Sequence, residues 1–191
     1  SNLNLLVEPV PSAAKQQRLQ QWLVPRRGQA SIVYVTQQKT AEQVAERLAR
    51  DGLAVSAYHA GMAHEVRESI QRRFMAGELQ CIVATIAFGM GIDKRDIRNV
   101  VHFDLPKSVE NYSQEIGRAG RDGQASDCLV LASRDGLSVL ENFVYGDTPE
   151  LGGICTVLDD LRAVGTGGQW ELMLGQLSEL SNIRADRKSV V

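Results

Sequence analysis

Cysteine is scarce in this sequence, and the spacing of the few that occur excludes two structural classes. The 191 residues include Cys81, Cys128 and Cys155, an odd total with no CxxC pair. A scattered, odd set of cysteines argues against a disulfide framework, and the missing CxxC pair argues against a zinc cluster, so we expect neither, and no metal site. Cys81 and Cys128 lie within apolar runs and are predicted to be core residues.

Long apolar runs and a surplus of basic charge are also missing. No stretch approaches the roughly 20 apolar residues that cross a bilayer, and no basic segment followed by an apolar one marks a leader. We therefore expect a cytoplasmic protein without membrane contact. The formal net charge of −2 indicates that any nucleic-acid contact is local rather than carried by bulk electrostatics. The start at Ser1 without methionine predicts an excised fragment of a longer protein.

Strands rich in valine and isoleucine alternate with helical segments along most of the chain. The expected strands are residues 3–7, 31–35, 54–58, 80–84, 99–103 and 127–132, and the expected helices are residues 12–23, 41–50, 64–75, 108–117 and 134–144. Such an alternation is typical of a parallel sheet covered by helices on both faces. The pattern alone predicts a doubly wound α/β domain.

The alternation ends near Tyr145–Pro149, where glycine and proline follow the last predicted helix. Beyond it, Ile154–Val164 and Trp170–Ser181 are predicted helices with no strand between them. We therefore expect one domain over residues 1–145. Residues 146–191 are expected to form a short helical C-terminal extension, or the truncated start of an accessory domain.

The most informative motif is Gln114–Gly123, with the sequence QEIGRAGRDG. A helix from Ser108 is predicted to end at its glycines, which puts Arg118 and Arg121 where the backbone turns. Guanidinium groups suit the oxygens of a transferring phosphoryl group. The alternative is a solvated basic helix end that complements the helix dipole, and this motif alone does not decide between the two.

A second motif, Ala84–Lys94 (ATIAFGMGIDK), follows the apolar run Cys81–Val83. Together with QEIGRAGRDG it resembles motifs V and VI of superfamily 2 helicases. The two sequences most resemble those of the RecQ family of DNA helicases. Ile32–Val35 resembles that family's motif IV strand, and Tyr58–Met62 resembles its strand-end element near the nucleic-acid backbone. The resemblance covers residues 3–144 and implies a RecA-like parallel sheet sandwiched by helices.

The resemblance also implies roles for the arginine motif. Arg121 would be an arginine finger that reaches the γ-phosphate of ATP held by another domain, with Arg118 beside it. Gln114 would help to position or sense the nucleotide. These three residues are the candidate catalytic and nucleotide-binding groups of the motif, although an exposed helix glutamine without function remains the alternative for Gln114.

For the glycine-rich motif, the resemblance implies contact with the DNA backbone and a relay of the nucleotide state. Thr85 and Lys94 are the expected DNA contacts. Gly89 and Gly91 would allow the turn beside the nucleotide, and Asp93 would orient a ribose or an arginine. A plain strand-to-loop turn, in which the glycines serve geometry only, is the alternative.

His59 and Gly61 belong to a second predicted strand end. In open α/β sheets, ligands collect beyond the carboxyl ends of the strands, and the resemblance assigns both residues to the nucleic-acid site. His59 could contact a phosphate or a sugar, or its ring could be satisfied by neighbouring backbone, and both interpretations stay open.

Two parts of a complete motor are missing from the sequence, a G-x-x-x-x-G-K-[ST] loop and a DExH motif. Superfamily 2 helicases hydrolyse ATP between two RecA-like domains, so the resemblance implies the second domain, with ATP and Mg²⁺ held mainly by an upstream RecA-like domain of the same protein. The implied partner is single-stranded or duplex DNA, unwound 3′ to 5′ in repair and recombination. The isolated chain is predicted to be inactive. The four-cysteine zinc segment usual in RecQ enzymes is absent from the sequence, so no zinc is expected in this chain.

Two other functions stay open. One is an RNA helicase domain, because related motifs V and VI occur there. The other is a non-catalytic module of the same fold that binds nucleic acid or protein. The wording QEIGRAGRDG favours the DNA-acting RecQ group over the HRIGRTGR form of DEAD-box enzymes.

Overall fold

The computed structural model describes residues 2–85, 88, 93–136, 152, 155, 156, 158, 159 and 162. The chain divides into two compact units, Ser1–Leu140 and Glu141–Val191. All candidate site residues belong to the first unit.

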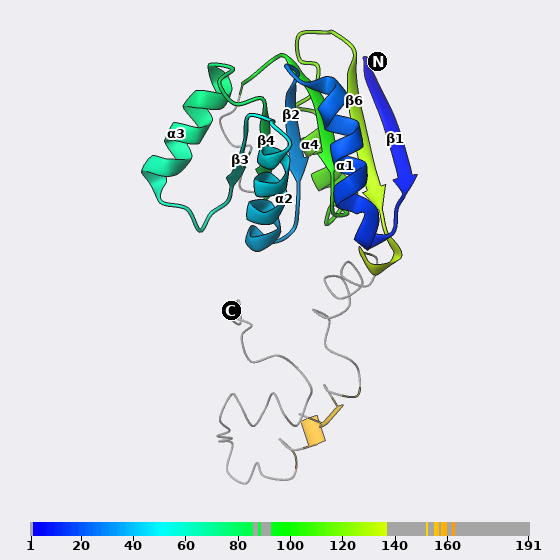
Figure 1. The fold of residues 1–191 in the computed structure, drawn as a ribbon. Coiled ribbons are helices and arrows are strands. Elements are labelled where there is room, and N and C mark those ends of the chain that lie inside the picture. Colours follow the sequence, from blue (N-terminus) through cyan, green and yellow to red (C-terminus); the bar gives the residue numbers. More distant parts are fainter. Residues whose placement is uncertain are drawn as a thin grey trace. The chain divides into compact units, whose positions relative to one another are not determined.

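A six-stranded parallel sheet forms the centre of the first unit (Figure 1). Its strands are β1 (Leu3–Pro9), β2 (Ala30–Tyr34), β3 (Val55–Tyr58), β4 (Cys81–Ala84), β5 (Ile97–His102) and β6 (Ser126–Ala132). They lie in the order β1-β6-β5-β2-β4-β3, and every neighbouring pair is parallel. Parallel neighbours need long crossover connections, which here bring helices onto both faces.

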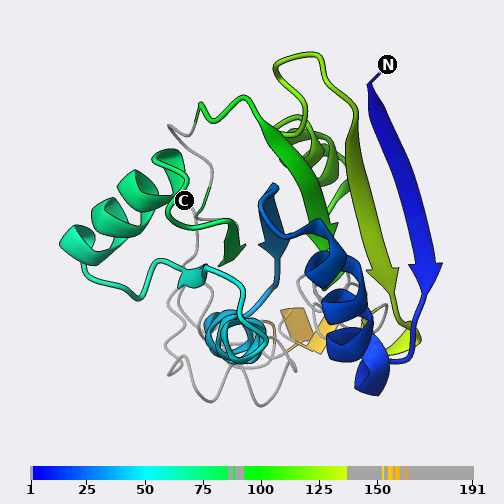
Figure 2. The ribbon, with the colours of Figure 1, turned by 45° about the horizontal axis from the view of Figure 1, so that its top comes forward.

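Helices α1 (Lys15–Leu23) and α2 (Gln38–Arg50) cover one face of the sheet, and α3 (His64–Met75) and α4 (Val109–Ile116) cover the other (Figures 1 and 2). Two 3-10 turns, Ser12–Ala14 and Val24–Arg26, flank α1. Helix α2 buries the apolar stripe Ala41, Val44, Ala45 and Leu48 and exposes charged residues, as expected for a helix that covers a sheet.

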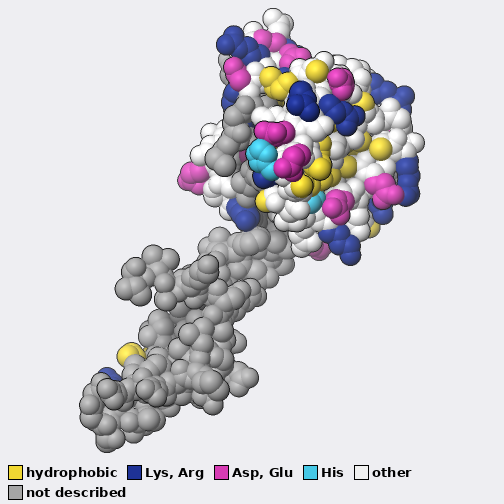
Figure 3. All heavy atoms as spheres, turned by 90° about the vertical axis from the view of Figure 1, so that its left-hand side faces the viewer, with side chains coloured by type: hydrophobic (Ala, Val, Ile, Leu, Met, Phe, Trp, Pro, Cys, Tyr) yellow, Lys and Arg dark blue, Asp and Glu magenta, His cyan; other side chains and the backbone are white. Residues whose placement is uncertain are grey.

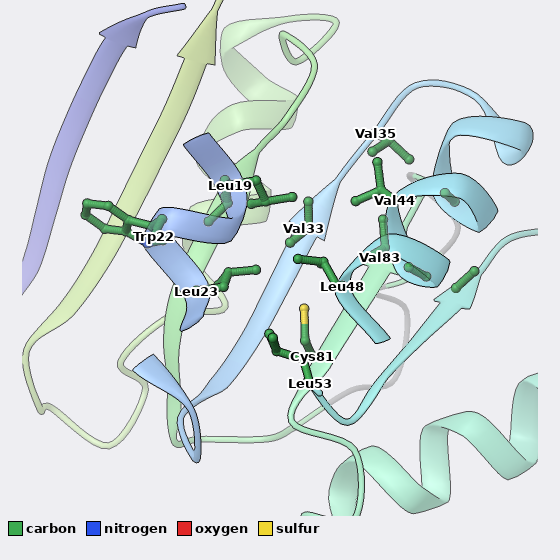
Figure 4. Close-up of a cluster of buried hydrophobic side chains, with 14 of the residues drawn as sticks. Leu19, Trp22, Leu23, Val33, Val35, Val44, Leu48, Leu53, Cys81 and Val83 are labelled. Atoms are coloured by element: carbon green, nitrogen blue, oxygen red, sulfur yellow. The ribbon is translucent and has the colours of Figure 1, made fainter. Parts of the chain in front are cut away.

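Alternate residues of the central strands contribute to two separate cores. Val33 and Val83 join the core under α1 and α2, whereas Ile32 and Ile82 join the core under α3 and α4. Figure 4 shows the first core, where side chains from α1 and α2 meet those of β2 and β4. Successive strand residues point to opposite faces, so continuous apolar runs are what a sheet buried on both sides requires.

The connections leave β2 and β5 in opposite directions. The chain after β2 passes through α2 to β3, and the chain after β5 passes through α4 to β6 on the other face. Ligands bind at such switch points in open α/β sheets, beyond the carboxyl ends of the strands. A small cavity of about 20 Å³ lies there, and its lining includes Tyr34, Thr36, His102, Asp104 and Glu115.

The predicted α/β alternation is confirmed, with small shifts at element ends. Helix α2 begins at Gln38 rather than at Ala41, because the polar first turn carries no apolar period. Cys81 and Cys128 are buried free thiols, as predicted, and burial raises the pKa of Cys81 to about 12. Of the helix predicted for residues 134–144, the described residues 134–136 are helical.

The described residues of the second unit, Gly152, Cys155, Thr156, Leu158, Asp159 and Arg162, are helical and exposed. All but Gly152 fall within the helix predicted for residues 154–164. The helix predicted for residues 170–181 lies outside the described residues, and the boundary between residues 145 and 146 stays a prediction. Within the described part of the chain, no helix combines the length and apolar character needed to cross a membrane.

Candidate functional site

The second part of the motif Gln114–Gly123, residues Gly117–Gly123, forms a tight loop after α4, which we call the arginine loop. Ser108 caps the helix by accepting a hydrogen bond from the backbone N–H of Asn111 at 3.1 Å, and the helix ends at Ile116. The loop then turns at Gly120, where a φ of 58° favours glycine. The predicted helix end beside the two arginines is therefore confirmed.

Contacts from β5 and from the residue before β1 hold the arginine loop. Gly120 donates its backbone N–H to the Ile97 carbonyl at 3.0 Å, and its own carbonyl accepts from Asn2 Nδ2 at 2.8 Å. Arg98 binds the Asp122 carboxylate through two guanidinium nitrogens, with Nη1 at 3.1 Å from Oδ1. This guanidinium holds the pKa of Asp122 below its usual value. The loop is thus tied to its neighbours at more than one point.

Arg121 extends from the loop to the surface, and its side chain is 38% exposed. Its Nη1 lies 3.3 Å from Asp93 Oδ1, and its Nε donates to the Gly117 carbonyl at 3.2 Å. Of the two roles expected for Asp93, the orientation of an arginine matches this geometry. Because Asp93 is 70% exposed, solvent screens the ion pair and keeps it weak. A stronger anion could therefore replace the carboxylate.

Arg118 and Gln114 differ in their surroundings. Arg118 is half-buried and lies near the hydroxyl of Tyr34, so that its charge opposes the rise in the pKa of Tyr34 to about 12 that burial causes. Gln114 is exposed on the last turn of α4. Gln114 and Arg121 thus face solvent, whereas Arg118 is partly covered.

The residues that directly follow β2, β3 and β4 lie side by side. We call these residues, together with the first turn of α2, the strand-end edge. Val35 donates its backbone N–H to the Ala84 carbonyl at 2.9 Å, and Thr85 donates its N–H to the Tyr58 carbonyl at 3.2 Å. The parallel pairing brings the loops after these strands together, because all strands end at the same edge.

His59 and Gly61 belong to the strand-end edge. The side chain of His59 is 5% exposed, and its Nε2 lies 3.2 Å from Glu42 Oε1 of α2. A side chain, rather than neighbouring backbone, therefore binds this nitrogen, while Nδ1 is buried with no hydrogen-bond partner among the described residues. A Cβ on Gly61 would lie 2.4 Å from Gln38 Oε1, so glycine lets this loop approach the start of α2.

The two lysines Lys94 and Lys39 differ in exposure. Lys94, an expected DNA contact, is only 10% exposed, with Nζ at 3.1 Å from Asp96 Oδ1 and 5.6 Å from the ring centre of Phe74. Lys39, which the sequence analysis did not single out, is exposed in the first turn of α2, where no side chain caps the helix. A helix N-terminus favours anions, and a lysine just after a buried strand was the available signal.

The structure thus separates the candidate residues into two groups. His59, Gly61 and Thr85 lie at the strand-end edge, whereas Arg121 and Asp93 lie near the start of β5. Gly89 and Gly91 lie outside the described residues. Acidic and basic side chains are mixed on the face seen in Figure 3, in keeping with the net charge of −2. Among the described residues, no group of three or more His, Cys, Asp and Glu side chains could hold a metal ion.

Sequence comparison identifies relatives over most of the first unit. Residues 14–123 match the family model described as Helicase conserved C-terminal domain. The chain is 45% identical over 139 residues to the ATP-dependent DNA helicase RecQ of Bacillus subtilis, an alignment that covers 73% of this chain and 24% of that protein. It is 47% identical over 135 residues to the RecQ-like DNA helicase blm-1 of Caenorhabditis elegans, covering 68% of this chain and 13% of that protein. The chain thus spans about a quarter or less of these relatives.

Structural comparison identifies the fold. The DEAD-box protein SrmB of E. coli, in a crystal structure with regulator of ribonuclease activity A, has a TM-score of 0.63 and 24% identity, covering 73% of this chain and 84% of that chain. This likeness confirms the RecA-like fold predicted from the sequence. The fold, the two motifs and the sequence relatives agree, and the chain therefore belongs to the helicase conserved C-terminal domain family, as a domain of RecQ type.

Proposed function

We propose that this chain is the second motor domain of an ATP-dependent DNA helicase and supplies Arg121, with Arg118 beside it, to ATP held by an upstream RecA-like domain. The observation that carries the proposal is the arginine loop, an anchored turn on which Arg121 reaches solvent beside the exposed carboxylate of Asp93. Negative charge spreads over the oxygens of a phosphoryl group during transfer, and a guanidinium placed there stabilises the transition state.

The residues of this chain fit ATP as additional contacts rather than as its main site. The sequence lacks the G-x-x-x-x-G-K-[ST] loop that cradles phosphates, whereas arginine forks match phosphate oxygens well. Mg²⁺ bound with the nucleotide in the upstream domain would neutralise phosphate charge. Arg121 would exchange Asp93 for the γ-phosphate, and Gln114 would contact the nucleotide from the last turn of α4.

We further propose that the strand-end edge grips the backbone of single-stranded DNA. The exposed Lys39 and the uncapped start of α2 support this proposal, together with the adjoining His59 and Gly61. Helix N-termini and backbone N–H groups hold phosphates without reading the base sequence. Opening and closing of the cleft between the two motor domains would then move the strand, with the 3′ to 5′ direction taken from family analogy.

The chain alone is expected to hydrolyse ATP at no more than the background rate, because it lacks the phosphate-cradling loop. Joined to the first RecA-like domain of a RecQ-type helicase, it should support DNA-stimulated hydrolysis. Phosphate release with Mg²⁺ and ATP, with and without single-stranded DNA, measures the hydrolysis rates of the chain alone and of the joined protein. Robust hydrolysis by the chain alone would contradict the proposal, and so would a folded, ATP-binding joined protein that stays inactive.

Replacing Lys39 by alanine in the joined protein should weaken single-stranded DNA binding several-fold and reduce the slope of log K against log salt by about 0.7 to 1. The physical reason is the loss of one phosphate contact. Fluorescence anisotropy with a labelled oligonucleotide at several salt concentrations measures both quantities.

The matched control is Arg50→Ala, at the other end of the same helix. Arg50 is 71% exposed and pairs with Glu46 at 2.6 Å, so its loss removes the same charge away from the strand-end edge. Equal effects at both positions would mean that bulk charge, not this edge, holds the DNA.

The same binding and turnover assays separate the alternatives. Stronger stimulation by RNA than by DNA of the same sequence would favour the RNA helicase function. DNA binding without any ATP hydrolysis that depends on Arg121 would favour the non-catalytic module.

A further inference from the structure

A buried pair of polar side chains, His102 and Glu115, adjoins the arginine loop and has no part in the proposed function. His102 is the last residue of β5 and is fully buried, and Glu115 lies buried in the last turn of α4. His102 Nε2 lies 2.7 Å from Glu115 Oε2. An ionised carboxylate can only accept, so in that state Nε2 donates this hydrogen bond.

Glu115 occupies a position on α4 that apolar packing alone would fill with an apolar residue. The nearby Ile116, partly buried, and Ala119, buried, pack into the core under α3 and α4. A buried carboxylate is unfavourable unless it is well bonded, and an apolar pair of similar volume often stabilises a fold as well or better. Stability alone therefore does not account for the pair.

Two routes connect the pair to the arginine loop. The backbone N–H of Arg118 donates to the carbonyl of Glu115 at 3.3 Å, so the position of Glu115 directly sets that of Arg118. On the other side, the His102 ring stacks on Tyr34 with ring centres 5.4 Å apart and planes 23° apart. The Tyr34 hydroxyl in turn lies near the Arg118 guanidinium.

We infer that His102 and Glu115 are positioning residues that fix the orientation of the arginine loop relative to β5. The inference rests on the proposed role of Arg121 in hydrolysis. Without the carboxylate, the last turn of α4 loses its direct side-chain link to β5, and the arginines take up other orientations. An arginine fork has to meet phosphate oxygens in a defined direction, and a displacement of about 1 Å can lower a rate by about 100-fold.

The first test uses this chain without any partner domain. Glu115→Leu keeps the side-chain volume and removes the acceptor, whereas Glu115→Gln keeps an acceptor. The guanidinium Nε–H signals of Arg118 and Arg121 in NMR spectra should shift and broaden in the leucine variant and stay close to wild type in the glutamine variant. Unchanged signals in a folded Glu115→Leu protein would overturn the inference.

Two further variants complete this test. Glu110→Leu, at an exposed position in the first turn of the same helix, should leave the arginine signals unchanged. His102→Asn removes the ring that joins Glu115 to Tyr34 and carries the same expectation as Glu115→Leu, so the outcome does not depend on the folding of one variant.

The second test measures turnover in the joined protein. Glu115→Leu should lower kcat by about 10- to 100-fold and leave KM for ATP nearly unchanged, because the upstream domain holds the nucleotide, and Glu115→Gln should restore most of the loss. Normal kcat in Glu115→Leu, where Arg121→Ala is inactive, would overturn the inference. If Arg121→Ala is itself fully active, the proposed function fails, and the arginine signals in the chain alone decide whether the pair positions the loop.

Discussion

Replacing Arg121 by alanine in the joined two-domain protein is expected to lower DNA-stimulated ATP turnover by about 10³- to 10⁵-fold, the range that an arginine finger contributes. Arg121 is exposed on an anchored loop, and its contact with Asp93 is weak enough to be exchanged for a phosphate. No other side chain on this loop combines exposure with a guanidinium, since Arg118 is half-buried. Steady-state phosphate release at saturating ATP and DNA measures the effect.

The interpretation requires that folding and DNA binding stay intact. The Arg121 side chain is a surface group, so the free energy of unfolding should change by no more than about 0.5 kcal/mol. Arg50→Ala removes a more exposed arginine at the far end of α2 and should retain full turnover. Full turnover in Arg121→Ala would exclude the finger and direct attention to Arg118 or to a binding function.

Replacing Gly120 by alanine is expected to destabilise the domain by about 2 to 5 kcal/mol. A φ of 58° costs an L-residue about 1 to 2 kcal/mol, and overpacking adds about 1 to 3 kcal/mol. The new Cβ would lie 2.4 Å from Asn2 Nδ2, 2.7 Å from the Gln124 carbonyl and 2.8 Å from Ser126 Oγ. The carbonyl belongs to the backbone and cannot rotate away, so the loop has to move. Urea unfolding of the chain measures the change.

Gly123 provides the matched control within the same loop. Its φ of 81° is also in the left-handed region, but a Cβ there would meet nothing within 4 Å. Gly123→Ala should therefore show only the backbone term, about 1 to 2 kcal/mol. Equal destabilisation by both variants would mean that close packing around Gly120 does not hold the arginine loop.

The order of strands and helices could be predicted because the sequence patterns of both kinds of element are strong. Apolar runs such as Cys81–Ala84 lie between turn residues, and the helices carry apolar residues at helical spacing. The ends were less predictable. Helix α2 starts in a polar turn without an apolar period, and the first turn of the predicted helix 12–23 is a 3-10 turn.

The partners of the site residues could not be predicted, because they come from distant parts of the chain. Asp93 precedes β5 and pairs with Arg121, because backbone hydrogen bonds hold the arginine loop beside the start of β5. Lys94 shows the same limit, since the sequence does not indicate that this lysine is only 10% exposed, with its Nζ paired to Asp96 and placed over the Phe74 ring.

The sequence by itself determined the α/β class, the RecQ-type motifs and the absence of a phosphate-cradling loop, because these depend on residue types at short spacing. Only the tertiary structure decided which arginine reaches solvent, that His59 is held by Glu42, and that His102 binds Glu115. Exposure and hydrogen-bond partners depend on how the parallel strands bring remote segments together, and no local pattern encodes that arrangement.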